Sequence, residues 1–209
     1  MRKVSSDPSL WLLLVLNLYC IYYFNQHPEG FKTVVWIYWI QSILIGFFNF
    51  LDLLTMKNGQ PSSFMINDKP YDGSKTANGC AALFFLFHYN VFHLVYAIFI
   101  LIQVKGSLDL RFLLLSTIII IIECVMGFVR NKRMQQQQMV NVGFVFVMPY
   151  LRIIPMHLMI LLPGFLGMNA SIIFLILKSI TDVIMYLVAH NIYARPVSRT
   201  NSITSSQIP

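Results

Sequence analysis

Long runs of apolar residues, separated by shorter polar stretches, dominate the pattern along the chain. A helix needs roughly 20 predominantly apolar residues to cross the hydrocarbon core of a bilayer. We expect transmembrane helices at 9–24, 33–54, 80–103, 108–129, 148–168 and 170–191. The pattern therefore predicts an all-α, polytopic membrane protein with about six transmembrane helices, all within one domain at 1–193.

The fifth of these segments has the least regular pattern. Pro149 and Pro155 interrupt it, and the apolar stretch 139–148 comes immediately before it. Because proline removes a backbone hydrogen bond, we expect a kink near Pro155 and expect the preceding residues to lie along the membrane interface. The tail at 194–209 is rich in Ser and Thr, and we expect it to be disordered and cytoplasmic.

Composition supports the same fold class. Of 209 residues, 57% are hydrophobic and 11% are charged, whereas a soluble domain carries about 25% charged residues. The three cysteines form no Cys-x-x-Cys pair, so the sequence predicts neither a disulfide framework nor a thiolate metal site. No small-x-small cleavage site follows the first apolar run, so we expect that run to remain as a transmembrane helix.

The positions of the basic residues predict the orientation. With the N-terminus inside, the inner regions hold ten of the fifteen Lys and Arg residues and the outer loops hold three. This bias favours both termini in the cytoplasm. The basic residues separate apolar runs, so the net charge of +7 does not indicate a nucleic-acid partner. The expected partner is the lipid bilayer, and the sequence leaves open whether other membrane subunits also bind.

Several ionisable side chains fall within the predicted helices. A charged group at the bilayer centre costs about 3 kcal/mol or more, so such groups usually face the interior of the bundle. At a rise of about 1.5 Å per residue, five of them lie at similar depth, and Arg152 and Lys178 flank the set. The five are His88, His93, Glu123, His157 and Asp182. This spacing predicts a polar cluster at mid-depth.

Helical spacing limits how this cluster is arranged. Lys178, Asp182 and His190 fall on one stripe of the last helix, because they are separated by multiples of four residues. His88 and His93 are five residues apart, or about 140° around a helix. These two histidines therefore do not easily serve one small site, and the pattern does not decide which of them faces inward.

Three interpretations of the cluster are open. His93, His157 and Asp182 are candidate ligands for zinc or iron, with Glu123 as the acid or base of a membrane-embedded hydrolase. Two histidines on different helices are also candidate haem ligands. No His-Glu-x-x-His motif supports these options.

The second interpretation is a proton or ion path in a transporter, although the chain has no internal repeat. The third is a structural or accessory protein, in which ion pairs and hydrogen bonds hold the helices together. We favour the third, without an established enzymatic activity.

Short motifs in four of the segments suggest a known family. They are Tyr38-Trp39-Ile40 with Ile45-Gly46 and Phe48-Asn49, Phe87-His88-Tyr89 with Phe92-His93, the run from Pro149 to Leu158, and Leu177-Lys178 with Asp182. Together they resemble a bacterial family of multi-pass membrane proteins that is defined only as a domain of unknown function. The resemblance covers about 32–190. It implies a bacterial inner-membrane location and no particular activity.

Two positions depart from the pattern of that family. Gln41 stands where a glutamate is frequent, and Tyr186 stands where a histidine is frequent. A histidine at 186 would extend a row of metal ligands along the last helix, whereas tyrosine is a poorer ligand for zinc. This departure weakens the metal interpretation for this chain.

Overall fold

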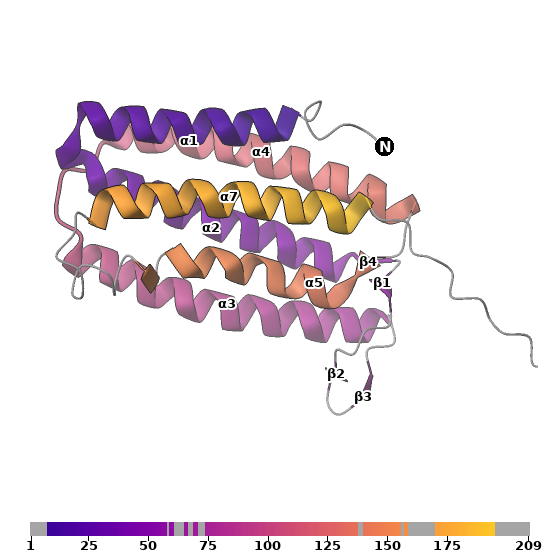
Figure 1. The fold of residues 1–209 in the computed structure, drawn as a ribbon. Helices are drawn as coiled ribbons and strands as arrows, with labels where there is room; N and C mark the ends of the chain where they lie inside the picture. Colours follow the sequence, from indigo (N-terminus) through magenta and orange to yellow (C-terminus); the bar gives the residue numbers. More distant parts are fainter. Residues whose placement is uncertain are drawn as a thin grey trace, which may run out of the picture.

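The computed structural model of the chain describes residues 8–57, 59–60, 65–66, 69–70, 74–137, 140–155, 157–158 and 170–194. Six α-helices in this part run along a common axis (Figure 1). They are α1 (Pro8–Gln26), α2 (Phe31–Leu54), α3 (Lys75–Gln103), α4 (Leu110–Gln137), α5 (Val142–Val147) and α7 (Ala170–Ala194). The 3-10 segment η2 (Pro28–Gly30) precedes α2, and η3 (Met148–Arg152) follows α5.

Five stretches of helix are long and apolar enough to cross a membrane. They are Pro8–Gln26, Pro28–Leu54, Lys75–Gln103, Leu110–Gln136 and Ser171–Val188. The prediction of an all-α, polytopic membrane protein is therefore confirmed. A further apolar helical stretch, Val142–Pro155, is shorter.

The fifth predicted segment differs most from its expected bounds. Helix α5 begins at Val142, six residues before the expected start, because the side chain of Asn141 accepts a hydrogen bond from the backbone N–H of Gly143 at 3.0 Å and caps the helix. At Met148 the helix tightens into η3, with Pro149 in its first turn. Residues 159–169, which complete the predicted segment, and the tail at 195–209 lie outside the described residues.

Two short strand pairs lie near one end of the bundle (Figure 1). β1 (Gly59–Gln60) pairs in parallel with β4 (Val140–Asn141), and β2 (Met65–Ile66) pairs antiparallel with β3 (Lys69–Pro70). The first pair joins the chain after α2 to the start of α5. Helix α1 begins and α7 ends at this same end of the bundle.

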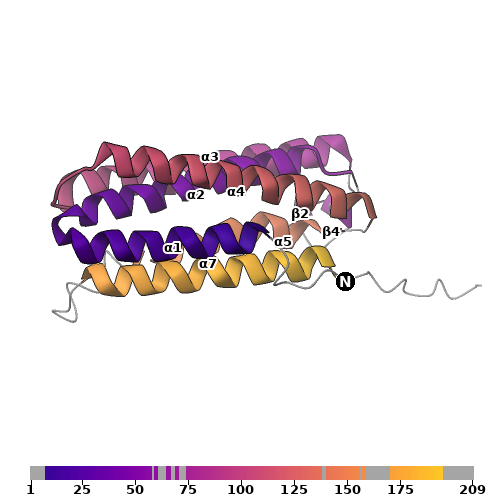
Figure 2. The ribbon, with the colours of Figure 1, turned by 90° about the horizontal axis from the view of Figure 1, so that it is seen from above.

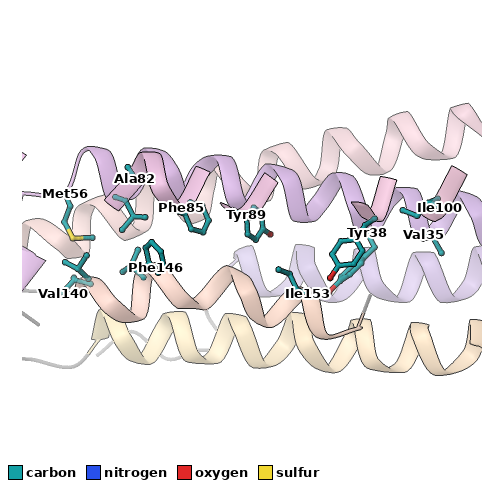
Figure 3. Close-up of a cluster of buried hydrophobic side chains, with 14 of the residues drawn as sticks. Val35, Tyr38, Met56, Ala82, Phe85, Tyr89, Ile100, Val140, Phe146 and Ile153 are labelled. Atoms are coloured by element: carbon teal, nitrogen blue, oxygen red, sulfur yellow. The ribbon is translucent and has the colours of Figure 1, made fainter. Parts of the chain in front are cut away.

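Helix α2 is central and packs most extensively against α3 and α4, while α1 lies against α4 and α7 (Figure 2). Aromatic rings fill the space between α2, α3 and the α5–η3 stretch, among them Tyr38, Phe85, Tyr89 and Phe146 (Figure 3). The ring of Tyr89 lies directly against Gly46, where a Cβ atom would overlap it. The lack of a side chain at position 46 therefore allows α2 and α3 to approach closely.

Candidate functional site

Asp182 is the centre of a buried charged cluster, which we define as Asn17, Arg152, Lys178 and Asp182. Its Oδ1 atom lies 2.6 Å from Nη1 of Arg152, in an ion pair. Its Oδ2 atom lies 3.0 Å from Nζ of Lys178 and accepts a hydrogen bond from Nδ2 of Asn17 at 3.1 Å. Nζ of Lys178 also donates to Oδ1 of Asn17 at 2.7 Å.

The charged cluster joins three parts of the chain. Lys178 and Asp182 lie one turn apart on α7, Arg152 ends η3, and Asn17 lies in the middle of α1. Tyr38 of α2 completes the surroundings, because Arg152 and Lys178 lie 4.9 and 5.6 Å from the centre of its ring. The face of an aromatic ring attracts cations, and this attraction is stronger away from water. With two cations and one carboxylate, the cluster has an excess of one positive charge.

The guanidinium of Arg152 is not fully satisfied. The side chain is only 1% exposed, and Nε and Nη2 have no hydrogen-bond partner in the part of the chain that the structure describes. These two nitrogens lie on the same edge of the guanidinium plane, and that edge is one of the two that bind a carboxylate or phosphate through parallel hydrogen bonds. An unpaired donor pair of this kind inside a membrane is costly.

A cavity of about 140 Å³ lies beside the charged cluster. Its volume is close to that of the engineered apolar cavity of about 150 Å³ that binds benzene. Apolar side chains of α1, α2 and α5 form part of its wall. Its polar lining includes Asn49, Glu123, Arg130, Asn131, Arg152 and Asp182. The lining continues to Asp52, two residues before the end of α2, where Lys132 pairs with this carboxylate at 2.7 Å.

Glu123 lies on α4 and lines this cavity. Its carboxylate accepts a hydrogen bond from the hydroxyl of Ser9 at 3.4 Å, and its Oε2 atom lies 3.9 Å from Sγ of Cys124. Both contacts are long. Within the described chain, no ion pair joins Glu123 to a basic residue.

The structure decides which histidine of α3 faces inward. His93 is 2% exposed, whereas His88 is exposed. Nδ1 of His93 lies 2.9 Å from the carbonyl oxygen of Tyr89, and Nε2 lies 2.8 Å from the hydroxyl of Ser42. A carbonyl only accepts, so Nδ1 carries a proton, and in the neutral ring Nε2 accepts from Ser42.

The other predicted ligands have different partners. Nδ1 of His88 lies 2.8 Å from the hydroxyl of Tyr150, and Nδ1 of His157 lies 2.7 Å from the hydroxyl of Tyr96. Thus His93, His157 and Asp182, the predicted metal ligands, do not share a site. Among the residues that the structure describes, no group of three or more His, Cys, Asp and Glu side chains is placed to hold a metal ion.

Sequence reasoning identified Arg152, Lys178 and Asp182 but not the other members of their surroundings. Asn17 was missed, although it is a polar residue in the middle of the apolar run of the first segment and this was an available signal. Tyr38 was not identified as part of this site either. Its role depends on the rotation of α2 against η3 and α7, which the sequence does not specify.

Comparison with known proteins gives a family but no activity. None of the curated proteins and none of the solved structures matches the chain. A family model matches residues 1–199, almost the whole length. The resemblance to a family of unknown function is thereby confirmed, and the chain belongs to the family of unknown function DUF6498.

Proposed function

We propose that this protein binds a small polar molecule in its intramembrane cavity and acts as a carrier or receptor for it. The observation that carries this proposal is a cavity of about 140 Å³ whose lining includes Arg152 and Glu123. In the described chain, two nitrogens of Arg152 have no hydrogen-bond partner and Glu123 forms no ion pair. Ionisable residues inside membranes usually mark a solute path or a ligand site, because an unpaired charge is otherwise costly there. The proposed location is a bacterial inner membrane, as the sequence resemblance implies.

A structural or accessory role is the second candidate. It is favoured by the charged cluster, because the partners of Asp182 come from α1, η3 and α7 and so hold three parts of the bundle together. Under this alternative the cavity would hold only water, and no solute would bind in it with measurable affinity. The two candidates therefore differ in one observable property, which is whether a solute binds in the cavity.

A metal-dependent hydrolase built on His93, His157 and Asp182 has less support. Each of these side chains has its own hydrogen-bond partners, which are Ser42 for His93, Tyr96 for His157 and Asn17 for Asp182. The three would have to leave these partners in order to bind one ion.

Gly127 provides a test of the proposal. It lines the cavity, and a Cβ atom placed on it meets nothing within 4 Å, so Gly127→Leu adds a large side chain at the cavity lining without a clash at Cβ. Gly79 of α3 is a matched control, because its Cβ position is equally open and it is not part of the cavity lining. Both substitutions replace a helical glycine with leucine, so they change helix propensity by a similar amount, roughly 1 kcal/mol.

The measurement is equilibrium binding of glycerol, urea, propionate, ethylamine and glycine to the purified protein in detergent. We expect at least one probe to bind to the wild type and to Gly79→Leu, and to bind at least about tenfold more weakly to Gly127→Leu, which corresponds to about 1.4 kcal/mol. If all three proteins are folded and no probe shows this dependence, the binding proposal fails and the structural role stands.

A further inference from the structure

We infer that the ligand of this cavity is a small zwitterion that carries a carboxylate and an ammonium group, as an α-amino acid does. This inference rests on the proposed function and deepens it. It follows from two side chains of opposite charge that line the same cavity. In the described chain, Arg152 has two nitrogens without a hydrogen-bond partner, and Glu123 forms no ion pair.

Arg152 provides the anion-binding end. Within the described residues its Nε and Nη2 atoms lack acceptors, and they form the edge that donates two parallel hydrogen bonds to the oxygens of a carboxylate. The Nδ2 atom of Asn49, which lines the same cavity, is also buried and has no hydrogen-bond partner in that part of the chain. A carboxylate would therefore find a charged fork and an amide donor around it.

Glu123 provides the cation-binding end. Its described contacts are the hydroxyl of Ser9 at 3.4 Å and the thiol of Cys124 at 3.9 Å, neither of which neutralises a carboxylate. The other two carboxylates of the lining already have cations, because Asp182 pairs with Arg152 and Lys178 and Asp52 pairs with Lys132. Arg152 and Arg130 attract the Glu123 carboxylate without forming an ion pair with it in the described chain. A ligand ammonium would supply that ion pair.

Charge complementarity favours a zwitterion over a simple anion or a simple cation. A simple anion would pair with Arg152 but would be repelled by Glu123. A simple cation would pair with Glu123 but would be repelled by Arg152. The charged cluster has one excess positive charge, and Glu123 has one negative charge. A zwitterion satisfies both groups and leaves the net charge of the cavity unchanged, which is favourable where the effective dielectric constant is low.

The size and the remaining wall of the cavity limit the ligand further. A volume of about 140 Å³ suits a molecule comparable with benzene. Ile45, Phe48, Val145 and Met148 provide an apolar wall beside the polar groups. We therefore expect glycine and alanine, with no side chain or a short aliphatic one, to bind better than amino acids with long or charged side chains.

The test measures binding of radiolabelled alanine to the wild-type protein in phosphatidylglycerol nanodiscs, with unlabelled competitors. We expect glycine to displace alanine, and propionate and ethylamine, which each lack one charge, to displace it at least about tenfold less well, because a hydrogen bond to a charged group contributes about 1.5–3 kcal/mol. O-phosphoethanolamine serves as the competitor that replaces the carboxylate with a phosphate, as in a lipid headgroup.

Two variants locate the two ends of the ligand. In Glu123→Gln, we expect the affinity for alanine to fall at least about tenfold and that for propionate to be unchanged or higher. In Asn49→Leu, we expect the affinities for alanine and propionate to fall together, because both have the carboxylate. Asn90→Leu is the matched control, since Asn90 is exposed on α3, donates a hydrogen bond to the carbonyl of Leu86 and is not part of the cavity lining.

The outcomes separate this inference from the proposed function. If propionate or ethylamine binds as tightly as alanine and Gly127→Leu weakens that binding, the zwitterion is excluded while the cavity remains a binding site. Stronger displacement by O-phosphoethanolamine than by glycine would also overturn the carboxylate assignment. If no probe shows binding that Gly127→Leu weakens, both proposals fail.

Discussion

At the scale of single residues, Arg152 and Asp182 are almost completely buried and each depends on the other. Removing one partner of a buried ion pair leaves an uncompensated charge, which costs about 3–5 kcal/mol. Glu123 is also an acid inside the bundle, but its described contacts are long hydrogen bonds to a hydroxyl and a thiol. The two acids should therefore respond differently to neutralisation.

We predict that Asp182→Asn strongly destabilises the protein, by about 3–5 kcal/mol, because Arg152 and Lys178 would lose their carboxylate. Glu123→Gln should change the stability by less than about 1 kcal/mol, because it breaks no ion pair of the described chain. Thermal unfolding in detergent, followed by gel filtration, checks both variants. Equal losses of stability in the two variants would contradict the larger structural role assigned to Asp182.

The sequence predicts the presence of this polar site better than its partners. Lys178 and Asp182 can be paired from their spacing alone, since they lie one turn apart on a helix. The contacts of Asp182 with Asn17 and Arg152 depend on how three separate elements rotate and pack, which helical periodicity does not determine. The same limitation explains why His93, His157 and Asp182, which are similar in predicted depth, have separate partners in the structure.

At the scale of elements, the contact between α2 and α3 combines a close approach with a polar network. Gly46 lets the ring of Tyr89 pack on α2, and the hydroxyl of Tyr89 lies 2.8 Å from that of Ser42, one turn earlier on α2. Ser42 in turn bonds to His93. The position of Tyr89 therefore links packing at Gly46 to the hydrogen bonds of Ser42 and His93.

We predict that Gly46→Ala destabilises the protein by about 1–3 kcal/mol, since the new methyl group overlaps the Tyr89 ring in a well-packed core. Gly127→Ala is the control, because the same change there meets open space and also raises helix propensity. The midpoint of thermal unfolding in detergent measures both effects. A Gly46→Ala protein as stable as Gly127→Ala would show that α2 and α3 do not need this close approach.

Element boundaries were predictable wherever the apolar runs are long. The helices α2, α3 and α4 correspond to the runs expected from 33, 80 and 108 onward, although α3 begins earlier, at Lys75, where the hydroxyl of Ser74 caps it. The α5–η3 stretch was harder to define, because its two prolines suggested a start at 148 whereas Asn141 caps the helix that begins at Val142. A capping residue such as Asn141 can mark the start of a helix in the sequence. Here apolar residues lie on both sides of it, so the start of the helix does not stand out from the hydrophobic pattern.

At the scale of the whole molecule, α1 begins and α7 ends at the same end of the bundle (Figure 1). The distribution of basic residues predicts that this end faces the cytoplasm. The cavity lining continues toward this end, to Asp52 near the end of α2. A solute would then approach the cavity from the cytoplasmic side.

We predict opposite accessibility for the two ends of α3. Lys75 is its first residue, and Lys105 lies just beyond its last one, and both side chains are exposed. In a Cys80→Ser background, a membrane-impermeant maleimide should label Lys105→Cys in intact cells, and should label Lys75→Cys only after permeabilisation. Labelling of Lys75→Cys alone in intact cells would reverse the orientation.

A small molecule must reach the cavity for the cavity to be a binding site, and two native cysteines report whether one does. Cys20 and Cys124 are both buried in one hydrophobic cluster, but only Cys124 belongs to the cavity lining. The measurement is the rate at which each is modified by methyl methanethiosulfonate in the folded protein, read by peptide mass spectrometry. We expect Cys124 to react faster than Cys20 and Gly127→Leu to remove the difference, whereas equal rates in the wild type would show that the reagent does not reach the cavity preferentially.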